Sequence, residues 1–269
     1  MDPTVESVSA KAVHEAAAQR LVDASITRIP CDPIRDLLPH GTMEDGYAVQ
    51  RLVLDTTKAN ARRVGRKIGL TSPVVQQQMG VDTPDFGVLF ADMACGDGEP
   101  VSSSLLLQPR VEAEVAFVLN GDLPDRPVIG SDVLRATDFV VAAIEIVDSR
   151  IKNWDISITD TVADNASSGM FVLGGSPRSL RDIEDLRTCE MTLSCEGEIV
   201  SSGTGAACLG HPVNAVVWLA NAVAERGVPL RAGEVILSGS LGPLVTVDRG
   251  KTYEAAITGL GTVRASFEP

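Results

Sequence analysis

Two glutamates are spaced so that a β-strand would place them side by side. Residues 111–119 read VEAEVAFVL, in which apolar residues alternate with the two acidic ones at the start of the run. Because successive side chains of a strand point to opposite faces, Glu112 and Glu114 share one face and the apolar side chains share the other. A solvated strand face is the ordinary explanation for such a pair. Two carboxylates on one face are also what a binding site for a hard cation requires.

A third glutamate stands where a carboxylate is unexpected. Glu145 lies within residues 139–147, FVVAAIEIV, a run that otherwise has the pattern of a strand buried on both faces. A lone buried carboxylate is strongly destabilising unless it is paired or bound to a metal. Either a nearby cation, Arg150 or Lys152, or a divalent ion shared with the two glutamates above would compensate it.

The chemistry of these three side chains favours particular metal ions. Carboxylates without a neighbouring imidazole or thiolate suit Mg²⁺ or Mn²⁺, which prefer oxygen ligands and keep open positions for water or substrate. Zinc fits less well, since His14, His40 and His211 all lie outside these strands. Spacing alone leaves a metal site and a structural acid both open.

One lysine could supply the positive charge that such a site needs. Lys67 lies in residues 65–72, GRKIGLTS, where a solvated surface lysine is the ordinary interpretation. Three carboxylates and one divalent ion leave a net negative site, so an anionic acid would need a further cation. A lysine at that position could also transfer protons.

Two glycine-rich segments resemble other active sites but lack a required residue. Ser240, in SGSLG, has the surroundings of a nucleophile elbow, but Ser238 stands where that motif requires glycine. Residues 203–208, GTGAAC, lack the third glycine of a dinucleotide-binding fingerprint. We therefore expect neither a serine hydrolase nor a nicotinamide enzyme.

The elements that must position these residues begin with helices. Apolar and small residues recur at helical spacing over residues 9–28, and a second helical stretch covers residues 43–60. A short third helix is expected after the N-cap Ser72, with Pro73 at its first position and Gly80 at its end.

After residue 81 the chain changes to short runs of β-type sequence separated by Gly, Pro and Asp. These runs are residues 111–119, 138–147, 170–175, 189–194, 198–202, 234–239, 244–247 and 253–259. One late helix is predicted over residues 211–226. We predict an α+β fold with a helical N-terminal region, residues 1–80, and a β-rich catalytic domain, residues 81–269.

Composition excludes several classes of partner. The 269 residues carry a formal net charge of -13, which disfavours binding to nucleic acid or to an anionic membrane surface. Five cysteines at irregular spacings indicate reduced thiols rather than a disulfide framework. The N-terminus lacks the basic and apolar segments of a signal peptide, and the uncharged stretch 199–224 is interrupted by Gly and Pro. We expect a cytoplasmic protein without a membrane span.

Five motifs, in this order along the chain, resemble the 2-oxopent-4-enoate (2-hydroxypentadienoate) hydratases of the fumarylacetoacetate hydrolase superfamily. They are RKIGLTS, VDTPDFGVLFADM, PRVEAEVAFVL, AAIEIVDSRI and DTVADNASSG. The resemblance implies a mixed β-roll of the fumarylacetoacetate hydrolase C-terminal type with a helical N-terminal region. It implies a lyase that uses Mg²⁺ or Mn²⁺ to hydrate 2-hydroxypenta-2,4-dienoate to 4-hydroxy-2-oxopentanoate in meta-cleavage aromatic catabolism.

The resemblance also assigns roles to individual residues. They are the metal ligands Glu112, Glu114 and Glu145, the catalytic residues Lys67 and Asp85, and the substrate contacts Leu70 and Ser167. It suggests a homo-oligomer that acts on a small 2-oxo or 2-hydroxy-dienoic acid, with an aldolase of the same pathway as a further partner.

Two other functions stay open. A 2-oxo-3-hexenedioate (4-oxalocrotonate) decarboxylase would share the fold, motifs and metal, and would need a cation such as Arg66 or Arg110 for its second carboxylate. A non-catalytic organic-acid-binding protein would keep the glutamates and lose the proton-transfer groups, yet Lys67 and Asp85 are both present. Hydrolytic C–C cleavage in the superfamily uses a histidine-centred pair, and no histidine here falls in the matching motifs.

Overall fold

The computed structural model describes residues 3–38, 40–72, 76–77, 81–125 and 127–269. Its α-helices are α1 (Pro3–Thr27), α2 (Met43–Thr57), α4 (Gly130–Ala136), α5 (Ile158–Ala163) and α6 (Pro212–Glu225). α1, α2 and α6 confirm the three longer helices predicted from the sequence, although α1 begins earlier than expected. The short helix expected between Ser72 and Gly80 lies largely outside the described residues. Within that segment the structure describes Gln76 and Gln77, and both are helical.

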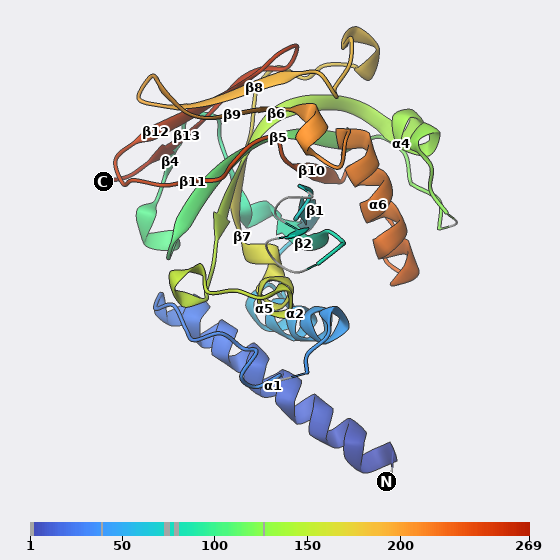
Figure 1. Cartoon of the computed structure of the whole chain (residues 1–269), viewed down its shortest axis with the longest axis vertical. Coiled ribbons are helices and arrows are strands. Elements are labelled where there is room, and N and C mark those ends of the chain that lie inside the picture. The colour runs from blue at the N-terminus through green and yellow to red at the C-terminus, as the bar shows by residue number, and fades with distance from the viewer. Residues whose placement is uncertain (1–2, 39, 73–75, 78–80, 126) are drawn as a thin grey trace.

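The larger sheet has eight strands in a mixed arrangement. In order they are β2 (Asp85–Phe90), β1 (Arg63–Gly69), β10 (Val235–Ser240), β5 (Pro109–Leu119), β6 (Thr137–Asp148), β7 (Ser168–Leu173) and β3 (Ala94–Cys95), with β11 (Val245–Thr246) beside β5. β1 and β10 are parallel, whereas β10, β5, β6 and β7 are successively antiparallel. Figure 1 shows that β5 and β6 bend along their length, so the sheet is curled.

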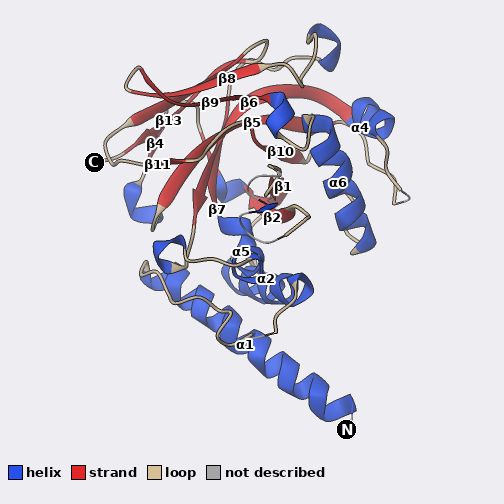
Figure 2. Cartoon of the chain, in the orientation of Figure 1, coloured by secondary structure: helices blue, strands red, loops and turns tan. Residues whose placement is uncertain are grey.

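A second sheet of five strands covers one face of the first. The helical layer, which consists of α1, α2 and α5, lies at the opposite side of the molecule (Figures 1 and 2). Its order is β4 (Pro100–Val101), β13 (Gly261–Phe267), β12 (Thr252–Ile257), β8 (Glu190–Cys195) and β9 (Glu198–Thr204). The eight predicted runs are all strands, β5 to β12. β1 was not expected from the sequence. The predicted helical region over residues 1–80 therefore does not hold throughout, because residues 63–69 belong to the larger sheet.

The main hydrophobic core fills the space between the two sheets and beneath α6. Val115, Phe117 and Ile144 from the larger sheet meet Tyr253 and Leu219, and all five are buried. Each such side chain contributes about 1.5–3 kcal/mol on burial. The apolar alternation in β5 therefore faces this core, which directs the glutamates of the same strand to the other side of the sheet.

α6 is a helix of this core. Judged only by its length and composition, the segment Gly205–Glu225 is apolar and long enough to cross a membrane. Only Pro212–Glu225 is α-helical, however, and its length of about 21 Å is less than the roughly 30 Å of a bilayer core. His211 caps its first turn by accepting a hydrogen bond from Val213 N at 3.0 Å. Val216, Leu219 and Val223 of α6 are fully buried in the main core.

The N-terminal helices form a second hydrophobic cluster, while Tyr47 of α2 belongs to the main core. Leu21 of α1 and Val49 of α2 pack with Ile34, with Ile151 in the loop before α5, and with Ala163, the last residue of α5. The linker after α1 is tied to the same region, since Cys31 N donates to Arg150 O at 2.8 Å and Ile34 N donates to Asp160 Oδ1 at 2.8 Å. The helical layer thus supports the segment between β6 and β7.

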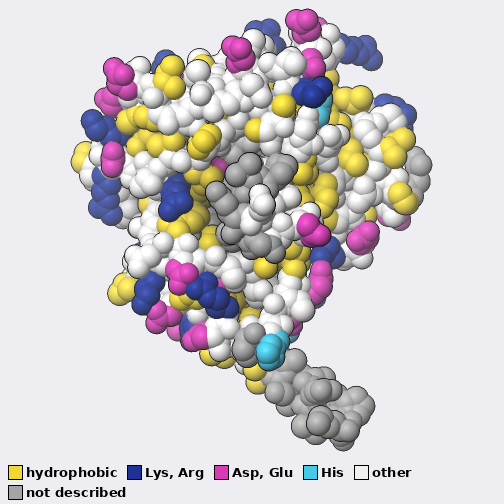
Figure 3. Space-filling view, in the orientation of Figure 1, with side chains coloured by type: hydrophobic (Ala, Val, Ile, Leu, Met, Phe, Trp, Pro, Cys, Tyr) yellow, Lys and Arg dark blue, Asp and Glu magenta, His cyan; other side chains and the backbone are white. Residues whose placement is uncertain are grey.

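The surface carries charges of both signs. Figure 3 shows Lys and Arg side chains interspersed with Asp and Glu over the described part of the visible face. A mixed distribution of this kind does not concentrate a positive field toward a polyanion.

Candidate active site

The three glutamates meet on the face of the larger sheet that is turned away from the main core. Glu112 on β5 lies directly opposite Glu145 on β6 in the antiparallel register, and Glu114 follows two residues along β5. One carboxylate oxygen from each residue lies within 4.8 Å of the others. Their exposed fractions are 7%, 0% and 1%, so the solvated strand face is excluded.

A small apolar cluster shields this face from water. Ala116 continues the row of Glu112 and Glu114 along β5, and Val141, Phe171 and Leu237 pack beside it. In these surroundings the charged form of each carboxyl is disfavoured. Burial and the charge of Glu145 raise the pKa of Glu112 to about 7, and burial with the same neighbour raises the pKa of Glu114 well above its usual range.

The donor set fits a divalent cation. Among the described residues, neither oxygen of Glu145 nor Oε1 of Glu114 accepts a hydrogen bond, although all three atoms are buried. Unsatisfied buried carboxylate oxygens that converge from neighbouring strands are strongly destabilising without a cation between them. An all-oxygen set suits Mg²⁺, Mn²⁺ or Ca²⁺ rather than Zn²⁺.

Lys67 is the cation that lies against this cluster. Its Nζ is 3.1 Å from Oε1 of Glu145, close enough for an ion pair although the direction is not that of a hydrogen bond. The side chain is 3% exposed, which excludes the solvated lysine. Burial lowers the pKa of Lys67, but the nearby charges of Glu145, Glu112 and Asp85 outweigh it and hold the pKa above its usual value. Lys67 therefore stays protonated.

The cations expected near Glu145 from sequence proximity lie elsewhere. Arg150 pairs with Asp164 and Lys152 pairs with Asp32. Both follow the end of β6, whereas Lys67 reaches Glu145 from β1, which is far away in the sequence. Of the two alternatives left open by the sequence, compensation of Glu145 by Arg150 or Lys152 is thus wrong.

Asp85 completes the charged group from β2. It lies opposite Gly69 of β1, and a Cβ at Gly69 would stand 2.2 Å from Asp85 Oδ1. Glycine at this position therefore makes room for the carboxyl. Asp85 is 1% exposed and its Oδ1 has no hydrogen-bond partner among the described residues. Burial raises the pKa of Asp85 despite the charge of Lys67, so this carboxyl can carry a proton.

A bulge in β10 positions Glu114. The register between β10 and β5 shifts after Leu237, and Gly239 N donates to Oε2 of Glu114 at 2.6 Å. Gly239 has φ +106, and a Cβ there would be 2.4 Å from the side chain of Thr71. Only glycine fits this position. The sequence predicts a strand over residues 234–239 and no nucleophile elbow after it, but not this bulge; the glycine between two serines was the available signal.

A cavity of about 910 Å³ opens beside the charged group. Lys67, Asp85 and Glu112 lie at its wall, as do the proposed substrate contacts Leu70 and Ser167. None of the described residues that line it is a histidine.

Four residues that line the cavity have left-handed backbone conformations: Leu70, Trp154, Ala166 and Ser167, with φ between 52 and 56°. For residues other than glycine this conformation costs ~1–3 kcal/mol each. Such strain persists where the surroundings determine the conformation, and it gathers at functional sites.

The two arginines considered for a second carboxylate have different surroundings. Arg66 pairs with Glu234 at 3.4 Å and does not line the cavity. Arg110 lines it, with its guanidinium 4.3 Å from the centre of the Trp154 ring. Within the described part of the chain, Arg110 makes no ion pair with an acidic residue. Trp154 was not identified from the sequence.

Comparisons with known proteins identify the family to which the chain is similar. The family model described as fumarylacetoacetate (FAA) hydrolase C-terminal matches residues 56–268. A 2-keto-4-pentenoate hydratase of Burkholderia vietnamiensis is 55% identical over 93% of this chain and 95% of its own length. A 2-hydroxyhexa-2,4-dienoate hydratase of Comamonas testosteroni is 45% identical over 97% of this chain and 99% of its own length.

Solved structures show the same architecture. The 4-oxalocrotonate decarboxylase of Pseudomonas putida, complexed with magnesium and adipate, is 37% identical, with a TM-score of 0.90 over 94% of this chain and 97% of its own. A fumarylpyruvate hydrolase of Pseudomonas aeruginosa, in complex with Mn²⁺ and pyruvate, has a TM-score of 0.62 over 77% of this chain and 90% of its own. At 16% identity the latter likeness concerns the fold alone.

Proposed function

The chain belongs to the fumarylacetoacetate hydrolase C-terminal family, and on that premise we propose that it hydrates 2-hydroxypenta-2,4-dienoate to 4-hydroxy-2-oxopentanoate in meta-cleavage aromatic catabolism. Relatives more than 50% identical over more than nine tenths of the chain are 2-keto-4-pentenoate hydratases, so the chain is a hydro-lyase. The observation that carries the proposed mechanism is the convergence of Glu112, Glu114 and Glu145 beside a cavity. Lys67 and Asp85 lie at the wall of the same cavity.

The three glutamates are the residues that would hold a divalent cation, with Mg²⁺ or Mn²⁺ as the proposed ion. Their unsatisfied oxygens and raised pKa values support this assignment. When bound, such an ion supplies Lewis-acid chemistry that offsets negative charge on the oxygens of the 2-oxo acid.

Asp85 and Lys67 have different proposed roles. In the reaction C5 of the dienol gains a proton while the 2-hydroxyl loses one, which gives the conjugated ketone. One water then adds across the double bond, with its hydroxyl at C4 and one proton at C3. Asp85, a buried carboxyl with a raised pKa, is suited to hold a proton and to give it to carbon. Lys67, whose pKa is raised by surrounding carboxylates, is suited to keep its charge and to stabilise the substrate's negative charge.

The remainder of the cavity is proposed to hold and orient the substrate. Leu70 and Ser167 lie at its wall and are the proposed contacts. Its volume of about 910 Å³ exceeds that of a five-carbon acid, which leaves room for a substituted dienoate. Apolar side chains such as Ile156 and Leu241 would exclude water from the reacting carbons.

Decarboxylation of a six-carbon diacid is the second candidate. One observation favours it: Arg110 lies at the cavity wall and has no acidic partner in the described chain. Its guanidinium could therefore bind a second carboxylate of the substrate. The 4-oxalocrotonate decarboxylase noted above is 37% identical, less than the hydratases. We therefore place the hydratase first.

The deciding experiment is an ultraviolet assay of 2-hydroxypenta-2,4-dienoate with identification of the product, with and without Mg²⁺. We expect 4-hydroxy-2-oxopentanoate, no CO₂, and activity only with the metal. Stoichiometric CO₂ from 2-oxo-3-hexenedioate, without hydration of the dienol, would reverse the ranking.

The setting of the enzyme is proposed on the family alone. We propose a cytoplasmic homo-oligomer, testable by light scattering, whose product passes to an aldolase that cleaves 4-hydroxy-2-oxo acids. Copurification with such an aldolase tests the second point.

A further inference from the structure

A strained turn carries one wall of the cavity. Asn165, Ala166 and Ser167 are consecutive residues with φ of 56, 52 and 52°, and none of them is glycine. Ala166 and Ser167 line the cavity, and Thr161 Oγ1 lies 3.4 Å from Ser167 Oγ. Three left-handed residues in succession do not persist from local preference alone, so surrounding contacts must impose this conformation.

Part of that support comes from β2. The amide side chain of Asn165 pairs with the backbone of Val88, donating to Val88 O at 3.0 Å and accepting from Val88 N at 2.8 Å. The turn also closes on itself, because Ser168 Oγ donates to Asn165 O at 2.7 Å. These contacts hold the first residue of the turn against the sheet.

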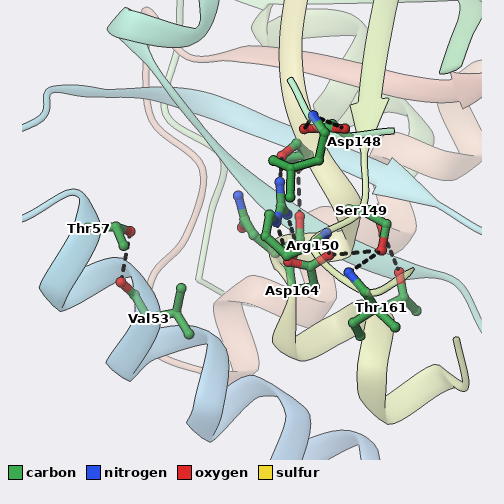
Figure 4. A network of polar contacts seen from close by, with 12 residues as sticks. Val53, Thr57, Asp148, Ser149, Arg150, Thr161 and Asp164 are labelled. Carbon is green, nitrogen blue, oxygen red and sulfur yellow. Dashed lines mark hydrogen bonds and ion pairs between the residues drawn. The ribbon is translucent and has the colours of Figure 1, made fainter. Parts of the chain in front are cut away.

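Arg150 contacts both ends of the same turn, and Figure 4 shows its side chain against Asp164. At the start of the turn its Nε and Nη2 donate to the carboxylate and to the carbonyl oxygen of Asp164. At the end its Nη1 donates to Ser168 O at 2.8 Å. The carbonyl of Asp164 also accepts from Ser167 N at 3.0 Å, the bond that closes the turn.

Asp164 is itself held by the segment that bears Arg150. Its Oδ2 accepts from Arg150 N at 2.9 Å and from Ser149 Oγ at 3.3 Å. The side chains of Arg150 and Asp164 are 12% and 2% exposed, so water does not compete strongly for these contacts. The planar fork of arginine reaches three acceptors at once, which the single ammonium of lysine cannot do.

We infer that Arg150 is a positioning residue for catalysis, which acts by holding Asn165–Ser167 in the left-handed conformation that places Ser167 at the substrate. This inference rests on the proposed hydratase reaction. A merely structural ion pair would need only opposite charges on residues 150 and 164, whereas positioning needs the contact with Ser168 O as well.

The test compares Arg150→Lys with wild-type protein in steady-state hydration of the dienol, at a temperature well below the melting point of both. Lysine keeps the charge and loses the fork, so we expect kcat/KM to fall at least 10-fold. Amide hydrogen exchange in the peptide that contains Asn165–Ser168 should become faster. Adding Ala166→Gly to the Arg150→Lys protein should restore part of the lost kcat/KM, since glycine adopts the left-handed conformation without strain.

Arg20→Lys is the matched control, because Arg20 also joins a carboxylate, Asp36, and a carbonyl, Pro33 O, but lies away from the cavity. It should leave kcat and KM unchanged. Ala166→Val is a second test that does not depend on the folding of an Arg150 variant. A β-branched residue resists the left-handed conformation, so this variant should also lower kcat/KM.

The outcomes separate the two proposals. Wild-type kinetics in Arg150→Lys, or in Ala166→Val if the arginine variant does not fold, would overturn the positioning role. Lower thermal stability of Arg150→Lys with unchanged kcat and KM would show an ion pair with a structural role only. Wild-type protein that does not hydrate the dienol would instead refute the proposed function.

Discussion

Glu112 and Glu145 are cross-strand neighbours on β5 and β6, two carboxylates placed opposite each other where an apolar or oppositely charged pair would stabilise the sheet. Like charges at such positions are destabilising, and these two are buried as well. Lys67 contacts Glu145 and its charge also acts on Glu112, but one cation does not balance the charges of both carboxylates. The sheet therefore keeps a negative charge that a bound cation would neutralise.

The first prediction concerns pH and metal together. A carboxyl with a higher pKa in the folded than in the unfolded protein binds its proton more tightly when folded. Since the pKa of Glu112 is raised to about 7, metal-free protein should lose stability as the pH rises through 7. Mg²⁺ binds the deprotonated carboxylates, so it should raise the melting temperature more at pH 8 than at pH 6.

Thermal melts in EDTA and in Mg²⁺ at these two pH values measure the effect. Glu112→Gln should flatten the pH dependence of the metal-free protein. An equal Mg²⁺ shift at pH 6 and pH 8 would contradict the assignment of these carboxylates to the metal.

The second prediction concerns Glu145. Glu145→Gln should lower kcat by roughly 10²-fold or more, the scale of a lost electrostatic group in an active site. It should also weaken Mg²⁺ binding measured by calorimetry, while circular dichroism stays that of a folded protein. Glu254→Gln, on the distant second sheet, is the control. Normal activity and metal binding in Glu145→Gln would leave Glu145 as a structural acid.

The third prediction concerns Lys67. Lys67→Ala should lower kcat/KM by roughly 10²-fold or more, because a cation among three glutamates and an anionic substrate is lost. Lys67→Arg should retain more activity than Lys67→Ala, since the raised pKa of Lys67 indicates an electrostatic role. Equal losses in both would instead point to proton transfer by Lys67. Lys58→Ala, which removes a lysine paired with Asp92, is the control.

The fourth prediction uses Gly69 to test Asp85 without changing its carboxyl. A methyl group at Gly69 would stand 2.2 Å from Asp85 Oδ1, so Gly69→Ala must displace that carboxyl. A misplacement of about 1 Å in a catalytic group costs roughly 10²-fold in rate. Gly175→Ala, where no atom lies within 4 Å of the added methyl, should behave as wild type. Unchanged kcat in Gly69→Ala would argue against a proton-carrying role for Asp85.

The sequence indicated the carboxylates well because their signals are local. The two-residue period of β5 places Glu112 and Glu114 on one face, and the apolar run of β6 marks Glu145 as buried. Strands β5 to β12 were predicted for the same reason, since each is a short run of β-forming residues.

The missed features depend on contacts between distant segments. β1 contains two glycines and three cations in seven residues, so its strand conformation comes from pairing with β2 and β10 rather than from propensity. Arg66 and Lys67 are adjacent, yet one pairs with Glu234 and the other with Glu145, which only the register of β1 decides. The bulge at Gly239 likewise follows from the pairing of β10 with β5.

The separation of the two hydrophobic clusters has a consequence for partial unfolding. Ile151 and Ala163, which flank the loop and the short helix beside the cavity, pack with α1 and α2 and not with the core between the sheets. Segments that share a cluster tend to open together as one cooperative unit. α1 and this wall of the cavity should therefore open together before the core between the sheets, to which α2 and α5 are also anchored through Tyr47 and Val162. In a denaturant titration, activity would then disappear before the circular dichroism of the β-sheets does.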